Sequence, residues 1–160
     1  MAPSSGSVAF TLPCQGARPQ TSCGGMPFAP FADQLSGTCR DYFAIDGWVN
    51  YRTADGNWLW VSRDVPLVTF GSQQVLARRK DAPSDMHRVL AMVFNNFWYT
   101  NFVGDSHGVM EFQFDLAWRK PAAEAVPPAS LAEGMTAEPV VLIQPAPREN
   151  PIFIRRLYQP

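Results

Sequence analysis

The chain has 160 residues, of which 46% are hydrophobic and 17% charged, and its formal net charge is −1. This length can bury a sizeable core in one domain, and the composition is that of a globular protein. A near-neutral charge argues against a nucleic-acid partner, which needs a basic surface to release counterions. No apolar stretch approaches the roughly 18 residues of a membrane helix. We therefore expect neither nucleic acid nor membrane as a partner, and the sequence does not indicate a compartment.

The first 38 residues are expected to form an irregular wrapping segment, because residues 13–37 are rich in Gly, Pro, Ser and Gln. Residues 8–12 before them could form a short edge strand. Cys14, Cys23 and Cys39 lie in this region, and their odd number and lack of C-x-x-C spacing favour free thiols. A disulfide from Cys23 to either neighbour stays open as the alternative in an oxidising compartment.

Residues 39–118 are expected to hold the core of a β-sandwich, because short apolar runs alternate with turn signals. The Asp55-Gly56 pair favours a tight hairpin, since both residues tolerate positive φ. In the returning strand Trp58 and Trp60 share one face while the opposite face is also apolar, so that strand is expected to be buried on both faces. The strands expected here are residues 39–52, 58–63, 66–70, 74–79, 87–94, 97–102 and 109–118.

The clearest strand pattern is the strict alternation in residues 110–116, which predicts one buried and one wet face. Residues 104–108 (GDSHG) supply a loop that reverses the chain into this strand. The residues expected on the buried face are Met110, Phe112, Phe114 and Leu116. Those expected on the wet face are Glu111, Gln113 and Asp115.

Residues 119–138 are rich in Ala and Pro and are expected to form a linker with a candidate helical turn at 130–134. In that turn Ser130 could be the N-cap, and the side chain of Glu133, three residues later, could bond back to it as in a capping box. Residues 139–160 are expected to add closing strands of the same domain, at 140–144 and 152–158. The whole pattern predicts an all-β antiparallel β-sandwich of about 8–10 short strands, with a long irregular N-terminal segment and no amphipathic helix.

No set of catalytic residues can be selected from the sequence. The two histidines, His87 and His107, belong to no metal-binding spacing, and a zinc site needs three or four ligands. There is no G-x-S-x-G nucleophile motif. Glycoside hydrolysis usually needs two carboxylates about 5–9.5 Å apart, and the spacing of the acidic residues selects no pair. We therefore expect no catalytic residue, metal site or cofactor in this chain.

Aromatic and amide side chains are the remaining candidates for binding. Tryptophan faces can stack on sugar rings, and asparagine amides offer both donors and acceptors to hydroxyl groups. The same aromatics are more often sandwich core, so both interpretations stay open. The carbohydrate or domain-interface candidates are Asn95, Asn96, Trp98, Tyr99 and Asn101.

Residues 95–102 (NNFWYTNF) resemble a run near the C-terminus of family-38 glycoside hydrolases, the α-mannosidase type. In that family a short Gly-containing loop and an alternating Phe-rich strand follow the run, as residues 109–116 do here. Residues 64–71 (DVPLVTFG) resemble an upstream element of the family, and residues 129–142 resemble a downstream one. The resemblance covers residues 48–142 and implies the C-terminal β-sandwich region of such an enzyme.

The resemblance implies three things about function. The parent enzyme would hydrolyse α-mannosidic bonds with a zinc ion, and the zinc ligands and catalytic aspartate would belong to an upstream α/β domain of the same polypeptide. This chain would be the far end of a larger enzyme, a non-catalytic scaffold that packs on that domain and could line the glycan cleft. The alternatives are a free-standing carbohydrate-binding β-sandwich and a structural interaction domain that binds no sugar.

Overall fold

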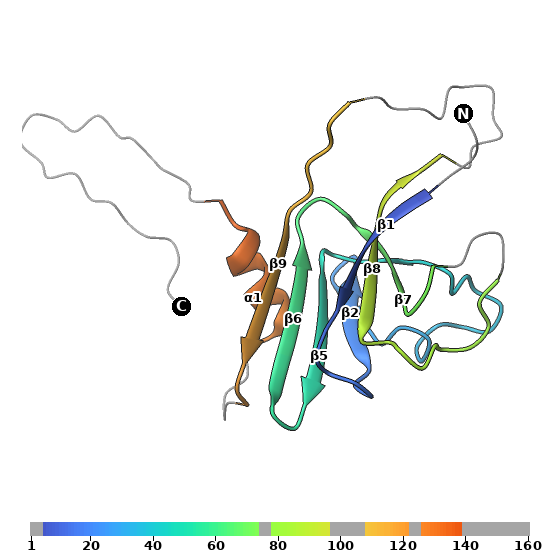
Figure 1. Cartoon of the computed structure of the whole chain (residues 1–160). Coiled ribbons are helices and arrows are strands. Elements are labelled where there is room, and N and C mark those ends of the chain that lie inside the picture. The colour runs from blue at the N-terminus through green and yellow to red at the C-terminus, as the bar shows by residue number, and fades with distance from the viewer. Residues whose placement is uncertain (1–4, 74–77, 97–107, 122–125, 139–160) are drawn as a thin grey trace, which may run out of the picture.

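The computed structural model describes residues 5–73, 78–96, 108–121 and 126–138, which form two antiparallel β-sheets and one helix (Figure 1). The four-stranded sheet has the order β1-β8-β7-β4, and the five-stranded sheet the order β3-β2-β5-β6-β9. The strands of the first sheet are β1 (Ser5–Thr11), β8 (Arg88–Asn95), β7 (Leu67–Phe70) and β4 (Phe43–Ala44). Those of the second are β3 (Met26–Phe28), β2 (Pro19–Cys23), β5 (Trp48–Thr53), β6 (Gly56–Ser62) and β9 (Phe114–Arg119). The predicted all-β sandwich is confirmed.

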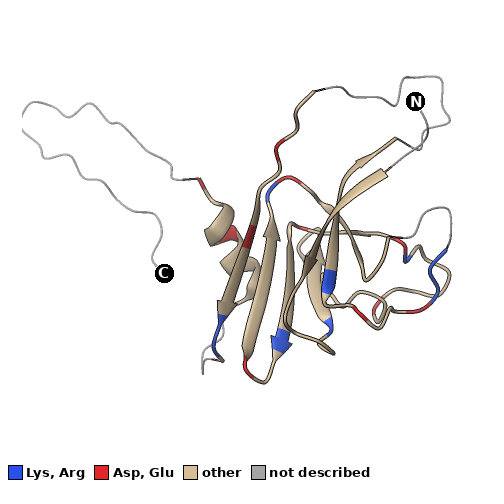
Figure 2. Ribbon diagram, viewed as in Figure 1, with Lys and Arg blue, Asp and Glu red and all other residues tan. Residues whose placement is uncertain are grey.

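The main core lies between the two sheets. Burying apolar area there contributes about 25 cal/mol per Å². The four-stranded sheet contributes side chains such as Phe70 and Val89, and the five-stranded sheet contributes Tyr51 and Trp60, all with no exposed surface. Few strand residues are charged, as Figure 2 shows. Trp60 is therefore a core residue, as expected from the two apolar faces of its strand.

The hairpin of β5 and β6 forms the centre of the five-stranded sheet, where Trp48 pairs with Val61 and Thr53 with Gly56. The hairpin was predicted, but its two-residue loop is Ala54-Asp55, so the turn lies one residue earlier than the Asp-Gly pair suggests. Alternate residues of β6 point to opposite faces. Trp60 packs between the sheets, whereas Leu59 and Val61 pack on the outer face.

The expectation that residues 13–37 are irregular is wrong in part. β2 and β3 form a hairpin there, and β2 pairs with β5 through Pro19–Tyr51 and Gln20–Asn50. The reversal uses Gly24 and Gly25, both at positive φ. The strands are short and rich in Ser, Thr and Pro, so the apolar period of two that indicates a strand is absent from them.

The expected strand over residues 109–118 is shorter and less buried than its alternation predicts, because β9 begins only at Phe114. Phe112 and Phe114 do pack against the main core, but Met110 is 53% and Leu116 56% exposed. Among the described residues β9 is the last strand of its sheet, so no described strand covers its outer side. Alternation identifies the face of a strand but not whether another element covers it.

A nine-residue helix, α1 (Pro128–Thr136), replaces the single turn expected at 130–134. It begins after Pro127 without a side-chain cap, so the predicted capping by Ser130 is wrong. A proline in the first turn needs no partner for its missing N–H, which is why the Pro-rich stretch starts a helix. Ala132 packs with Trp48, Leu59 and Val61. The expectation of no amphipathic helix is therefore wrong too.

Several predicted elements lie outside the described residues: the strands at 97–102, 140–144 and 152–158, and the loop at 104–108. The strand expected at 74–79 is described only at Arg78 and Arg79, which are not in a strand. The three cysteines are free, Cys14 buried and the other two exposed. No helix among the described residues is long and apolar enough to cross a membrane.

Candidate functional site

The predicted binding residues begin where β8 ends. Asn95 is the last residue of β8 and is exposed, and it pairs with Ser5 of β1 across the sheet. Asn96 follows it and is half-buried. Both asparagines have interaction partners. Trp98, Tyr99 and Asn101 lie outside the described residues, so the structure brings only the two asparagines together.

An exposed apolar surface lies on the side of the sandwich where β1 and β9 meet. Both strands are the last of their sheets. The rings of Phe10 and Phe114, one from each strand, lie 4.8 Å apart. Beyond this contact the core-facing sides of both strands continue as large exposed side chains. We call these side chains, together with Phe94 of β8, the apolar flank: Val8, Phe94, Leu116 and Trp118, between 39% and 56% exposed.

Two aromatic contacts shape the apolar flank. The Phe94 ring lies over the backbone of Gly6, its cross-strand partner, and a Cβ at Gly6 would be only 2.2 Å from that ring. Trp118 pairs with Trp58 of β6, with ring centroids 6.3 Å apart. Of the described tryptophans, Trp48 and Trp60 are buried, Trp58 is half-buried, and Trp118 is the exposed one.

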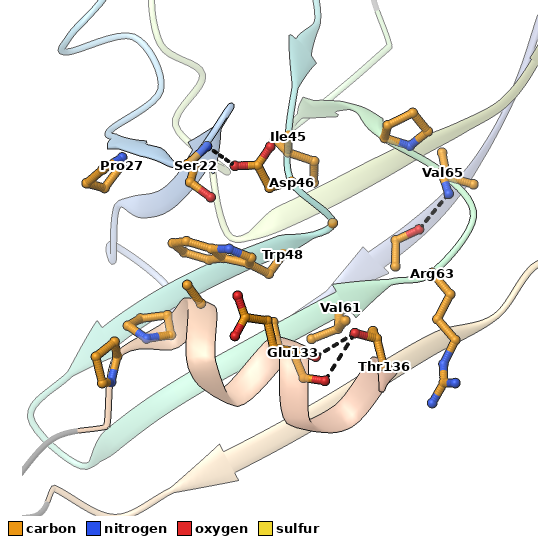
Figure 3. Close-up of a pocket in the computed structure, with 18 of the residues that line it drawn as sticks. Ser22, Pro27, Ile45, Asp46, Trp48, Val61, Arg63, Val65, Glu133 and Thr136 are labelled. Atoms are coloured by element: carbon orange, nitrogen blue, oxygen red, sulfur yellow. Dashed lines mark hydrogen bonds between the residues drawn. The ribbon is translucent and has the colours of Figure 1, made fainter. Parts of the chain in front are cut away.

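A groove of about 1120 Å³ lies on the opposite face of the five-stranded sheet. The β2–β3 hairpin forms one wall, α1 the other, and Trp48 and Val61 contribute to the floor. Figure 3 shows the Asp46 carboxylate on the hairpin side and the helix on the other, with Trp48 between them. This groove is not predicted from the sequence, because the residues of its helix wall are expected to form a linker and those of its hairpin wall to be irregular.

Asp46 is held in place by the hairpin turn. Its carboxylate accepts hydrogen bonds from the backbone N–H of Gly24 at 2.8 Å and of Gly25 at 2.9 Å. The Gly25 N–H, the Ser22 side chain and the Gly24 N–H stabilise the charged form and lower the pKa of Asp46 below its usual value. Gly47 follows at φ +82, where a Cβ would lie 2.8 Å from the Ser62 carbonyl oxygen. An Asp-Gly pair before a strand was the available signal for this turn.

Arg63 fixes the end of the groove where α1 stops. Its Nε donates to the Asp115 carboxylate at 3.1 Å, and its Nη2 donates to the carbonyl oxygen of Met135 at 2.6 Å. The second bond satisfies a carbonyl of the last helical turn, which has no partner within the helix. One guanidinium therefore joins α1 to the start of β9.

Metal-binding chemistry has no candidate cluster among the residues described, since no three His, Cys, Asp or Glu side chains group there to hold an ion. The groove and the apolar flank are candidate binding surfaces. Comparisons of the chain with protein-family models, curated proteins and solved structures found no match.

Proposed function

We propose that this chain is the C-terminal β-sandwich region of an α-mannosidase-like glycoside hydrolase, and that the apolar flank packs against the catalytic domain. In this proposal the chain is a scaffold that catalyses nothing by itself. Zinc and the catalytic aspartate belong to the upstream α/β domain of the same polypeptide, and the glycan meets this chain only where it borders the cleft.

The apolar flank carries the proposal. Single exposed apolar residues are ordinary, but a cluster on adjoining elements marks a surface that another protein part covers. Here the flank extends the core-facing sides of two strands that stand at sheet edges among the described residues, and such edges offer backbone groups to a neighbour. Asn95, the first residue of the run that resembles the family, directly follows Phe94 and is the last residue of β8.

The test adds this chain to the isolated zinc-bound α/β domain of a family-38 enzyme and measures association by analytical ultracentrifugation. We expect a complex with the wild-type chain and at least a tenfold weaker one with Leu116→Asp, because a buried unpaired charge is costly. The matched control is Leu35→Asp, which places the same charge on a more exposed loop residue outside the flank. Equal binding by wild type and both variants, or no binding by wild type, would refute the proposal.

A free-standing carbohydrate-binding module is the second candidate, favoured by the Trp58–Trp118 pair with its exposed Trp118 ring. Aromatic faces of this kind can stack on pyranose rings. Titration with an α-linked mannose oligosaccharide, followed by tryptophan fluorescence, separates the two functions. Saturable quenching that Trp118→Ala abolishes would favour the module, whereas an unchanged spectrum agrees with the scaffold.

A further inference from the structure

We infer that the groove between α1 and the five-stranded sheet is the docking site of this chain's own C-terminal segment, residues 139–160. The groove lies on the opposite sheet face from the apolar flank, so this inference does not rest on the proposed function. The sequence predicts that residues 139–160 add closing strands but does not indicate where they pack. The inference gives them an intramolecular site.

The size and lining of the groove suit an extended peptide. Pockets for small molecules usually measure about 300–1,000 Å³, and this groove of about 1120 Å³ is larger. Proline and apolar side chains line it beside several carboxylates. Grooves lined by aromatic side chains are known to bind extended proline-rich segments, and Trp48 lines this one. The apolar lining includes Pro27, Ile45, Val61, Val65 and Pro66.

Charge complementarity favours this segment as the occupant. Carboxylates outnumber guanidinium groups in the lining, and the Arg63 guanidinium is already paired with Asp115 outside it. The segment has the opposite balance, with three arginines and one glutamate. The lining acids are Asp46, Asp64, Glu133 and Glu138, and the segment's arginines are Arg148, Arg155 and Arg156.

The segment also starts at the groove. α1 ends at Thr136, and Glu138, the last described residue before residue 139, lines the groove itself. A tethered segment reaches its site at an effective concentration of about millimolar, which favours it over a free peptide. At roughly 3.3 Å per residue, residues 139–160 have a maximum reach of about 70 Å when extended.

The experiment uses the full chain with a nitroxide label on Gln159→Cys in a Cys23→Ser, Cys39→Ser background, which leaves Cys14 buried and unlabelled. We expect loss of most of the NMR signal intensity of the Gly25 and Glu133 amides through proximity to the label. The loss should be the same at low and high protein concentration. Arg155→Glu with Arg156→Glu should restore the intensity.

A charge exchange provides the matched control. Glu133→Lys with Glu138→Lys should also restore the intensity, and combining these changes with the two arginine reversals should bring the broadening back. Asp55→Lys, on the exposed β5–β6 turn away from the groove, should change nothing. Broadening that stays the same after the charge reversals would overturn the inference. So would full signal intensity of the Gly25 and Glu133 amides in the labelled wild-type chain. Broadening that grows with concentration would show a second copy as the occupant and would overturn it too.

Discussion

At the residue scale, Tyr51 is a buried side chain whose hydroxyl connects two parts of the core. It is fully buried on β5, and its hydroxyl donates to the carbonyl oxygen of Met86 at 2.6 Å. This bond connects the centre of the five-stranded sheet to the segment that leads into β8. The sequence suggests a buried aromatic here, but the acceptor lies 35 positions away and no local pattern reveals it.

Tyr51→Phe removes the hydroxyl and keeps the ring. The Met86 carbonyl then loses its donor inside the core, so we expect the free energy of unfolding to fall by about 1–2 kcal/mol. Urea denaturation followed by far-UV circular dichroism measures the change. The dependence on urea should stay as in wild type, because the exposed area on unfolding is the same. An unchanged stability would contradict the role given to this bond.

Alkaline pH should weaken the fold through Cys14. Burial raises the pKa of the Cys14 thiol from 9.0 to about 11. Between these values the unfolded chain loses the proton that the folded chain keeps, so stability is fully present below pH 9 and falls as pH rises to 11. Burial, with Cys14 as a second cause, raises the pKa of Tyr51 as well and adds to the loss.

The alkaline loss is measured as the urea midpoint at pH 8, 9, 10 and 11. The urea midpoint of Cys14→Ala should decline less than that of wild type over the same range. Of the two groups with a raised pKa, Cys14 and Tyr51, only Tyr51 then remains. Cys23→Ala, at an exposed thiol, is the control and should decline as wild type does. Identical slopes for Cys14→Ala and wild type would show that Cys14 does not contribute.

At the scale of elements, α1 is destabilised by a glycine within the helix. Gly134 lies inside the helix, and a Cβ there would meet nothing within 4 Å. Glycine costs about 0.5–1 kcal/mol relative to alanine in a helix. Gly134→Ala should therefore raise the free energy of unfolding by up to that amount, measured by thermal denaturation.

The contrasting variant for Gly134→Ala is Gly25→Ala in the β2–β3 turn. A Cβ at Gly25 also meets nothing within 4 Å, but the residue has φ +77, which strains any side chain. This variant should lower stability although the available space is the same. Gly25→Ala is expected to destabilise the fold in any case. Destabilisation by Gly134→Ala as well would show that another part of the chain occupies the space over Gly134.

Strands with a periodic pattern of apolar residues could be predicted from the sequence. Elements that form because they pack on a neighbouring element could not. The Trp-rich β6 has two apolar faces, and its burial followed from that pattern. β2, β3 and α1 have weak patterns and form because β5 and the outer sheet face give them a surface to pack on. The groove is bounded by these elements, which is why the candidate site could not be located from the sequence.

At the scale of the whole molecule, the apolar flank should make the isolated chain prone to self-association. Leu116→Lys places a charge on the exposed edge strand β9, a device that proteins use against edge-to-edge association. We expect lower binding of a hydrophobic dye and a higher concentration threshold for aggregation, measured by fluorescence and light scattering. Leu35→Lys, at a more exposed residue in a loop, should leave both unchanged. The two variants behaving alike would mean that the flank is no continuous surface.

The pairing of β1 with β8 determines the order in which the chain can fold during its synthesis. Val8 pairs with Ala91, so the N-terminal strand has no partner until most of the described chain has left the ribosome. At roughly 5–20 residues per second this wait is on the order of ten seconds, far longer than a hairpin needs to form. The β5–β6 hairpin can close early from local contacts, whereas the four-stranded sheet completes late. Released chains truncated after residue 100 should therefore resist proteolysis at β1 far better than released chains truncated after residue 80.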